Sequence, residues 1–201
     1  MSKLLYQLNS YQKEFQAVVQ AQDAENHAVV LDQTAFYPGG GGQPCDTGVL
    51  VHGDTSSTVQ RVKKVEGQTY HFIDKEQTLP ETGSQVSGKI DWERRYQLMR
   101  THTALHILCG VVFRDYGAQV TGGDMDPLQG RMDFEFESMH KELVDEIQAA
   151  VNLEVAAARE VQVRILPRQE AFEIPDLIRT KINLLPPGIP EVRVVEIKGL
   201  D

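Results

Sequence analysis

The first half of the chain follows a short-period pattern of hydrophobic and polar positions that is typical of β-structure. Short runs rich in β-branched and aromatic side chains are separated by Gly, Asp, Ser and Pro. We predict strands at residues 15–19, 27–31, 47–52, 58–65, 68–73 and 85–90. Short strands at such close intervals, with little helical periodicity, favour a small β-barrel or a β-sandwich.

After residue 88 the hydrophobic period lengthens to that of an α-helix. Asp91 is placed to cap a helix that runs to Tyr116, where Gly117 supplies a stop. The apolar stripe of this helix, at spacings of three and four, consists of Leu98, Leu105, Leu108, Val112 and Tyr116. Residues 131–137 alternate apolar and charged side chains, which predicts a strand with one solvated face.

The rest of the chain predicts a mixture of helices and strands. A second helix is expected at residues 139–159, where apolar residues recur at every fourth position from Leu143 to Val155. A strand at 161–166, a short helix at 168–173, a proline-bounded loop at 186–190 and a closing strand at 191–198 follow. This order favours an α+β layer with helices on one face of a sheet. We predict an α+β protein with domains at residues 1–88 and 89–201.

Composition places the chain among ordinary globular proteins. It has 201 residues, of which 41% are hydrophobic and 24% charged, enough for one large or two small domains. No apolar run approaches the roughly 18 residues of a membrane span, and the amino terminus lacks the apolar core of a secretory signal. Two cysteines, Cys45 and Cys109, make no disulfide framework, so a cytoplasmic location without a membrane partner is predicted.

The net charge of −9 argues against unspecific binding of DNA or RNA, which depends on neutralising many phosphates. A nucleic-acid partner is expected only through a local basic patch and a specific pocket. The pattern gives no indication of the oligomeric state.

Two histidines on the predicted long helix form a candidate metal site. His102 and His106 are four residues apart, so both side chains lie on one helix face. Neutral imidazole is a preferred zinc ligand. The alternative is a pair of partly buried histidines that only pack or hydrogen-bond. Thr103 stands where a zinc-protease helix carries its catalytic Glu, which argues against that class.

A run of four consecutive glycines at residues 39–42 is the most unusual stretch of the chain. Without Cβ atoms the backbone can approach a ligand closely, although a bare glycine run is also typical of a flexible hairpin loop. No Lys-Ser/Thr pair follows, which excludes a phosphate-binding P-loop. The run is flanked by aromatic and polar side chains suited to a small polar group: Thr34, Phe36, Tyr37 and Gln43.

Two long motifs resemble one known family. Asp32-x-Thr-x-Phe-Tyr-Pro-x-Gly-Gly-Gly-Gln43 and Arg100-x-His-Thr-Ala-x-His106 are similar to the editing domain of alanyl-tRNA synthetase, and more so to the free-standing alanyl-tRNA editing proteins called AlaX. Asp91-Trp-Glu-Arg-Arg95 and Arg193-Val-Val-Glu-Ile-Lys-Gly199 also resemble that family, in the same order. The resemblance spans nearly the whole chain.

The resemblance implies a fold and an activity. The fold is a small N-terminal β-barrel joined to an α+β editing domain, whose long central helix packs on a sheet, with the active site in the cleft between them. Family members are hydrolases that deacylate tRNA(Ala) mischarged with serine, and sometimes with glycine. The implied partner is therefore mischarged tRNA(Ala), and the implied cofactor is zinc.

The resemblance also implies roles for individual residues. His102 and His106 become zinc ligands, while Thr34 senses the serine hydroxyl. Gly40, Gly41, Gly42 and Gln43 form an edge that meets the aminoacyl end, with Thr34 and Gln43 as the residues assigned to catalysis. The zinc either activates water and polarises the ester carbonyl, or only orients the terminal adenosine.

The chain departs from the family after its closing strand. The family completes the zinc site with a Cys-x-x-x-His there, whereas this chain stops at Gly199-Leu-Asp201. Closed zinc sites use four protein ligands and catalytic sites three, and Cys109 lies about 10 Å along the helix from His102. We expect weak zinc binding by this chain, and a Cys-x-x-x-His soon after residue 201 if the natural protein continues. The alternative functions are a non-catalytic tRNA-binding or regulatory module and an unrelated metal-dependent hydrolase.

Overall fold

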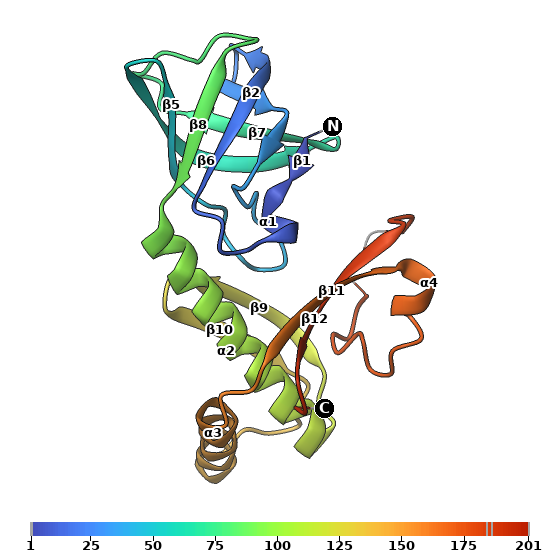
Figure 1. Ribbon diagram of the computed structural model, residues 1–201. Helices are drawn as coiled ribbons and strands as arrows, with labels where there is room; N and C mark the ends of the chain where they lie inside the picture. Colours follow the sequence, from blue (N-terminus) through green and yellow to red (C-terminus); the bar gives the residue numbers. More distant parts are fainter. Residues whose placement is uncertain (1, 184, 186, 201) are drawn as a thin grey trace. The chain divides into compact units, whose positions relative to one another are not determined.

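The chain folds into two compact units (Figure 1). The computed structural model describes residues 2–183, 185 and 187–200. The barrel unit comprises Met1–Met99 with Asp126–Leu128, and the C-terminal unit comprises Arg100–Met125 with Gln129–Asp201. The long helix α2 (Trp92–Tyr116) contributes residues to both. The division into domains at residues 88 and 89 stays a prediction.

The barrel unit is built on six antiparallel strands that close in the order β2-β3-β7-β6-β5-β8. The strands are β2 (Glu14–Asp23), β3 (Ala28–Leu31), β5 (Gly48–His52), β6 (Thr55–Val65), β7 (Gln68–Ile73) and β8 (Gln85–Ile90). The barrel closes because β8 pairs with both β2 and β5. Closure confirms the predicted barrel and excludes the sandwich, and all six predicted strands are present. The sequence pattern missed β1 (Lys3–Leu4), α1 (Leu5–Leu8) and β4 (Gln33–Thr34), and β1 pairs with β4 in parallel.

Side chains alternate between the inner and outer faces of the barrel strands, and the inward-facing ones are mostly apolar. Phe15 on β2 is buried, and its ring lies perpendicular to that of Phe36 at a centroid distance of 5.7 Å. Gly88 on β8 makes room for Phe15, since a Cβ at Gly88 would lie 2.3 Å from that ring. Phe36 in turn stands perpendicular to the imidazole of His71, 5.6 Å away. The interior therefore contains a row of rings that ends on a polar side chain.

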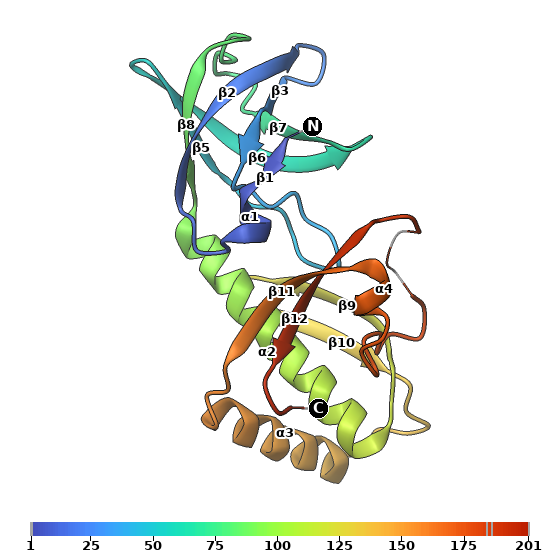
Figure 2. The same ribbon diagram turned by 45° about the vertical axis from the view of Figure 1, so that its right-hand side comes forward.

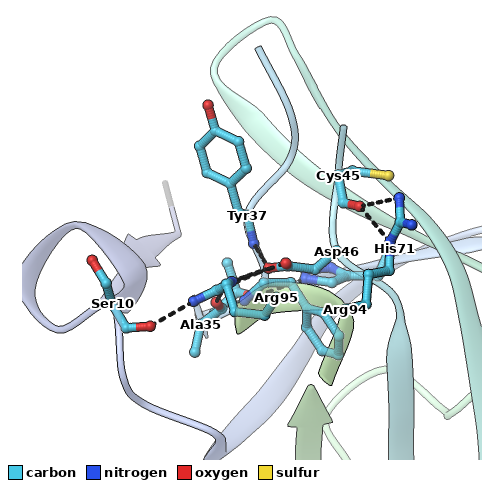
Figure 3. A network of polar contacts seen from close by, with 10 residues as sticks. Ser10, Ala35, Tyr37, Cys45, Asp46, His71, Arg94 and Arg95 are labelled. Carbon is cyan, nitrogen blue, oxygen red and sulfur yellow. Dashed lines mark hydrogen bonds and ion pairs between the residues drawn. The ribbon is translucent and has the colours of Figure 1, made fainter. Parts of the chain in front are cut away.

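A buried ion pair ties the start of α2 to the loop that precedes β5 (Figure 3). The side chains of Arg95 and Asp46 are only 3% and 0% exposed. Arg95 Nε donates to both carboxylate oxygens of Asp46, at 2.9 and 3.1 Å, and Nη2 donates to Asp46 as well. The same guanidinium donates to the carbonyls of Ala35 and Ser10, at 2.7 and 2.9 Å. Asp46 Oδ2 also accepts from the Tyr37 amide, so this one pair joins both ends of the loop.

The ends of helix α2 agree with the sequence prediction. Asp91 caps the helix, because its Oδ1 accepts from the Arg94 amide at 3.1 Å. The Asp91 amide donates to the carbonyl of Thr47, which anchors the cap to the loop before β5. At the other end Gly117 has φ +66° and its amide donates to Phe113, as expected for a glycine that ends a helix.

The C-terminal unit contains two hairpin-like sheets and two further helices (Figure 2). Its elements after α2 are β9 (Val120–Asp126), β10 (Gln129–Phe134), α3 (Lys141–Ala156), β11 (Val161–Pro167), α4 (Arg168–Ala171) and β12 (Glu191–Ile197). Helix α3 lies beside the end of α2 in both ribbon views, where Ile147 packs with Val112 and Ala118. The α+β class and the long helix packed on sheets are confirmed.

Details of the C-terminal unit differ from the prediction. The described strands form two separate two-stranded sheets, β9 with β10 and β11 with β12, rather than one continuous layer. Strand β9 was not predicted, because its sequence carries two glycines and two aspartates that weaken strand propensity. The predicted strand at 131–137 begins and ends earlier, and helix α3 is shorter at both ends. The predicted loop at 186–190 includes residue 186, which lies outside the described residues.

None of the helices in the described part of the chain is long and apolar enough to cross a membrane.

We expect Asp46→Asn to lower the free energy of unfolding of the barrel unit by about 3–5 kcal/mol, because it leaves the buried Arg95 charge uncompensated. Urea unfolding followed by the fluorescence of Trp92, the only tryptophan, measures this value. The matched control is Glu14→Gln, which removes an ion pair to Lys89 whose side chains are both 65% exposed. That change should cost less than about 1 kcal/mol. An equal decrease in the free energy of unfolding in both variants would contradict the conclusion that burial makes the Arg95–Asp46 pair more important than the exposed pair.

Candidate functional site

The glycine run folds into a tight turn rather than a flexible loop. Gly40 and Gln43 exchange two backbone hydrogen bonds of 3.0 and 3.1 Å around Gly41 and Gly42, whose φ angles are +60° and +80°. Positive φ at both central positions is the conformation of a type I′ turn, which strongly favours glycine. We name residues 40–43 the glycine turn.

The glycine turn is held at its base and open at its tip. The Tyr37 hydroxyl donates to the carbonyl of Gly40 at 3.0 Å, and its ring packs perpendicular to that of Tyr6. Gly41 has no atom within 4 Å of the position that a Cβ would occupy. Gly40, Gly41 and Gly42 are exposed and Gln43 is partly buried. A rigid, side-chain-free backbone edge of this kind is suited to close contact with a ligand.

Thr34, at the end of β4, is fully buried inside the barrel unit. Its hydroxyl lies 2.8 Å from Nε2 of His71 and accepts a hydrogen bond of 3.1 Å from the amide of Phe36. Nδ1 of His71 lies 3.2 Å from the carbonyl oxygen of Val29. The predicted substrate-sensing hydroxyl is thus part of an internal polar network.

Sequence reasoning did not single out His71. The signal for it was the alternation of β7, which places Thr69, His71 and Ile73 on the buried face. A histidine at an inward position of a barrel strand requires polar partners, because an unpaired buried polar group is costly. Complete burial lowers the pKa of His71 from 6.5 to about 4, although its bond to Val29 acts in the opposite direction.

The predicted metal ligands lie side by side on α2. The ring centroids of His102 and His106 are 4.9 Å apart and the ring planes differ by 21°. His102 is partly buried, and desolvation lowers its pKa from 6.5 to about 4, with the charges of His106 and Arg193 acting in the same direction. The pKa of His106 is lowered by the atoms packed around its ring and then by Arg179, although part of the side chain stays exposed. Both imidazoles are therefore neutral at pH 7, as metal binding requires.

No third ligand joins these histidines among the described residues, which contain no group of three His, Cys, Asp or Glu side chains that could hold a metal ion. Cys109 lies one turn further along the helix, and partial burial raises the pKa of its thiol, so it is protonated at neutral pH. The donor set of the described chain fits half of a zinc site.

The predicted site residues belong to different compact units. Thr34 and the glycine turn lie in the barrel unit, whereas His102 and His106 lie in the C-terminal unit. Each group is locally well ordered by hydrogen bonds or helix geometry. The assignment of all of them to one active site stays a prediction.

Comparison with known proteins finds relatives along the entire chain. Residues 3–94 match the family of class II (A) tRNA synthetases. The whole chain is 40% identical to the alanyl-tRNA editing protein AlaX-M of Saccharolobus solfataricus and 38% identical to that of Methanosarcina barkeri, and it covers 84% of each. It is also 37% identical to the alanine–tRNA ligase of Ignicoccus hospitalis, of which it covers 22%.

The low pKa of His71 predicts a pH dependence of stability. With a folded pKa of about 4 and an unfolded pKa of 6.5, His71 stays neutral in the folded state while the unfolded state takes up a proton. The contribution of His71 to the free energy of unfolding is therefore fully present above pH 6.5. It is lost as the pH is lowered towards 4, by up to about 3 kcal/mol.

The measurement compares urea unfolding of the unchanged chain and of His71→Gln at several pH values. When the pH is lowered from 7 to 4, the free energy of unfolding of the unchanged chain should fall by that amount relative to that of His71→Gln. A constant difference would show that His71 titrates alike in both states.

Proposed function

This chain belongs to the alanyl-tRNA editing proteins, and we propose that it acts in trans to hydrolyse the ester bond of tRNA(Ala) mischarged with serine. Members of this family are aminoacyl-tRNA deacylases. The observation that carries the proposal is the relationship to editing proteins over the complete chain, which includes both the glycine turn and the paired histidines. Glycine is a second amino acid that the same site would remove.

Serine is the amino acid that we expect an editing protein for tRNA(Ala) to remove. A pocket made for alanine cannot strongly reject an isostere that adds only a hydroxyl, so mischarging with serine needs correction. An editing pocket must invert this preference. A buried hydroxyl such as that of Thr34 supports such a selection, because serine can form a further hydrogen bond to it whereas alanine cannot.

We assign the glycine turn to the aminoacyl end of the tRNA. Its exposed tip lacks side chains, so a bulky ester can lie directly against the backbone. Gln43, beside the tip, offers an amide that both donates and accepts hydrogen bonds. The Tyr37 hydroxyl keeps the turn in one conformation by its bond to Gly40, which limits the entropy lost when substrate binds.

We propose zinc as the cofactor, with His102 and His106 as two of its ligands. Their neutral, neighbouring imidazoles fit this role. Zinc bound there would lower the pKa of a water molecule and polarise the ester carbonyl. The charges of Arg179 and Arg193 near the imidazoles favour an anionic group, such as a thiolate, as a further ligand.

The end of β12 is a suitable origin for the remaining ligands. Leu200 is only 2% exposed, and its side chain lies where a Cβ at Gly110 would be, at 2.8 Å. Gly110 is one helical turn beyond His106. A Cys-x-x-x-His that followed residue 201 would start beside the histidine-bearing stretch of α2.

We propose as a second candidate function a non-catalytic tRNA-binding or regulatory module of the same fold. The two partly buried free cysteines suit a reducing compartment, and we propose the cytoplasm as the location of either activity.

Deacylation assays separate the two functions. Purified protein is mixed with tRNA(Ala) charged with serine, glycine or alanine, and the remaining ester is measured over time with and without added zinc. Faster loss of serine than of alanine supports the editing hydrolase. Binding of the tRNA without any deacylation in the presence of zinc supports the non-catalytic module.

We expect the 201-residue chain to bind zinc weakly, because two imidazoles do not complete a site. A variant extended by a segment with Cys-x-x-x-His should bind one zinc tightly, and His102→Ala or His106→Ala should abolish that gain. Competition with a chromophoric chelator measures the affinity. His140→Ala is the control, since His140 is exposed and caps α3. Tight stoichiometric binding by the unextended chain would show that ligands other than the proposed ones complete the site.

We expect Thr34→Val to reduce the preference for Ser-tRNA(Ala) over Ala-tRNA(Ala) by about two- to tenfold, the equivalent of one hydrogen bond of about 0.5–1.5 kcal/mol. Thr34→Ser keeps the hydroxyl and is the matched control, which should retain the preference. The measurement is the ratio of the two deacylation rates. If the ratio is the same in both variants, Thr34 does not read the side chain.

A further inference from the structure

The Thr34–His71 pair carries an inference that the sequence motifs did not contain. Both side chains are 0% exposed, and the hydroxyl oxygen lies 2.8 Å from Nε2 of the imidazole. The two residues are 37 positions apart and come from different strands, β4 and β7. Their contact is therefore a product of the tertiary structure, which brings β4 against the barrel strand β7.

Hydrogen-bond complementarity decides which atom donates. The carbonyl of Val29 can only accept, so Nδ1 of His71, 3.2 Å away, carries a proton. In a neutral imidazole the other nitrogen then accepts. The complete burial of His71, which lowers its pKa to about 4, keeps the ring neutral near pH 7. Nε2 consequently accepts the hydroxyl proton of Thr34.

The Thr34 hydroxyl has one lone pair left that can accept a further hydrogen bond. A hydroxyl has one donor and two acceptor positions. His71 takes the donor, and the amide of Phe36 occupies one acceptor position at 3.1 Å. A substrate group that reaches Thr34 must therefore donate to it. The serine hydroxyl can donate, whereas the methyl group of alanine cannot.

We propose that His71 is a positioning residue for substrate selection: by holding the proton of Thr34, it fixes Thr34 as a hydrogen-bond acceptor for the serine hydroxyl. This proposal rests on the proposed function of Thr34 as the residue that reads the amino acid. Because Thr34 is 0% exposed in the structure, the proposal requires the side chains that cover it to move aside when the substrate binds. The Phe36 ring against the imidazole, 5.6 Å away, and the bond to Val29 keep the ring of His71 in place.

Two substitutions at His71 separate its two hydrogen bonds. In His71→Gln the amide stands near the position of Nε2, so its oxygen accepts from Thr34. In His71→Asn the shorter amide stands near Nδ1, so the bond to Val29 is kept and the acceptor for Thr34 is lost. Only the second change frees the Thr34 hydroxyl to rotate.

The experiment measures the ratio of deacylation rates of Ser-tRNA(Ala) and Ala-tRNA(Ala). We expect His71→Asn to lower this ratio about as much as Thr34→Val, and His71→Gln to retain most of it. The double variant Thr34→Val/His71→Asn should be no less selective than Thr34→Val alone, because the two residues act as one unit. If turnover is too slow, the ratio of Kd values for seryl and alanyl 3′-amino-3′-deoxyadenosine replaces the ratio of rates.

A second histidine–hydroxyl pair in the same barrel controls for a purely structural effect. His52 Nε2 lies 3.0 Å from the hydroxyl of Ser57, which is also fully buried. His52→Asn removes a histidine–hydroxyl bond that is only partly buried, and unfolding midpoints show how much each variant destabilises the barrel. A merely structural role of His71 would slow both deacylations equally, as in His52→Asn, and leave their ratio unchanged.

The outcomes distinguish the positioning role of His71 from the recognition of serine by Thr34. If Thr34→Val lowers the ratio and His71→Asn does not, the role of His71 is overturned while that of Thr34 stands. If neither changes the ratio, the reading of serine by Thr34 fails, and the positioning role fails with it.

Nitrogen-15 NMR of the His71 ring in the unchanged chain tests the inference without any variant. A protonated Nδ1 and a bare Nε2 are expected at neutral pH. A proton on Nε2 would reverse the donor and acceptor and overturn the proposal.

Discussion

The buried ion pair of Arg95 and Asp46 is the interaction on which the candidate site in the barrel unit depends. Taking both charges out of water is costly, and it is offset only when every polar atom of the pair is satisfied. The guanidinium meets this condition by also binding the carbonyls of Ala35 and Ser10. The loop between β4 and β5 is consequently closed at its base, where Figure 3 shows the Tyr37 amide bonded to Asp46. The glycine turn lies within this loop.

One group of buried polar atoms in the barrel unit lies where this loop begins. Thr34, His71 and the Phe36 amide satisfy one another just where the chain leaves β4 towards the glycine turn. Such a network stabilises only when it is complete, since a lone buried hydroxyl or imidazole would be destabilising. The network orients the Thr34 hydroxyl, and the proposed role of His71 rests on this orientation.

The paired histidines differ from these long-range contacts, because helix geometry alone brings them together. One helical turn suffices to bring His102 and His106 together, whatever the rest of the chain does. Desolvation lowers the pKa of both imidazoles and keeps them neutral, and the charges of Arg179 and Arg193 act in the same direction. The helix thus places two candidate ligands side by side, and the proposed zinc site requires further groups.

Sequence by itself determined the features that depend on a few neighbouring residues. The alternation of the barrel strands, the Asp91 cap, the Gly117 stop and the common face of the two histidines all follow from local backbone geometry. The motifs also determined the family. Strand β9 escaped prediction because its glycines and aspartates are poor strand formers, whereas its pairing with β10 and the bridge from Val120 to Thr180 are tertiary contacts.

Tertiary structure alone decided whether the strands form a barrel or a sandwich, because closure depends on β8 pairing with two strands far from it in sequence. It likewise decided the partners of Asp46, 49 residues from Arg95, and of Thr34, 37 residues from His71. No local pattern specifies such contacts, since many polar residues could meet across a folded chain. They are favoured because a buried charge or hydroxyl without a partner is costly once the chain has folded.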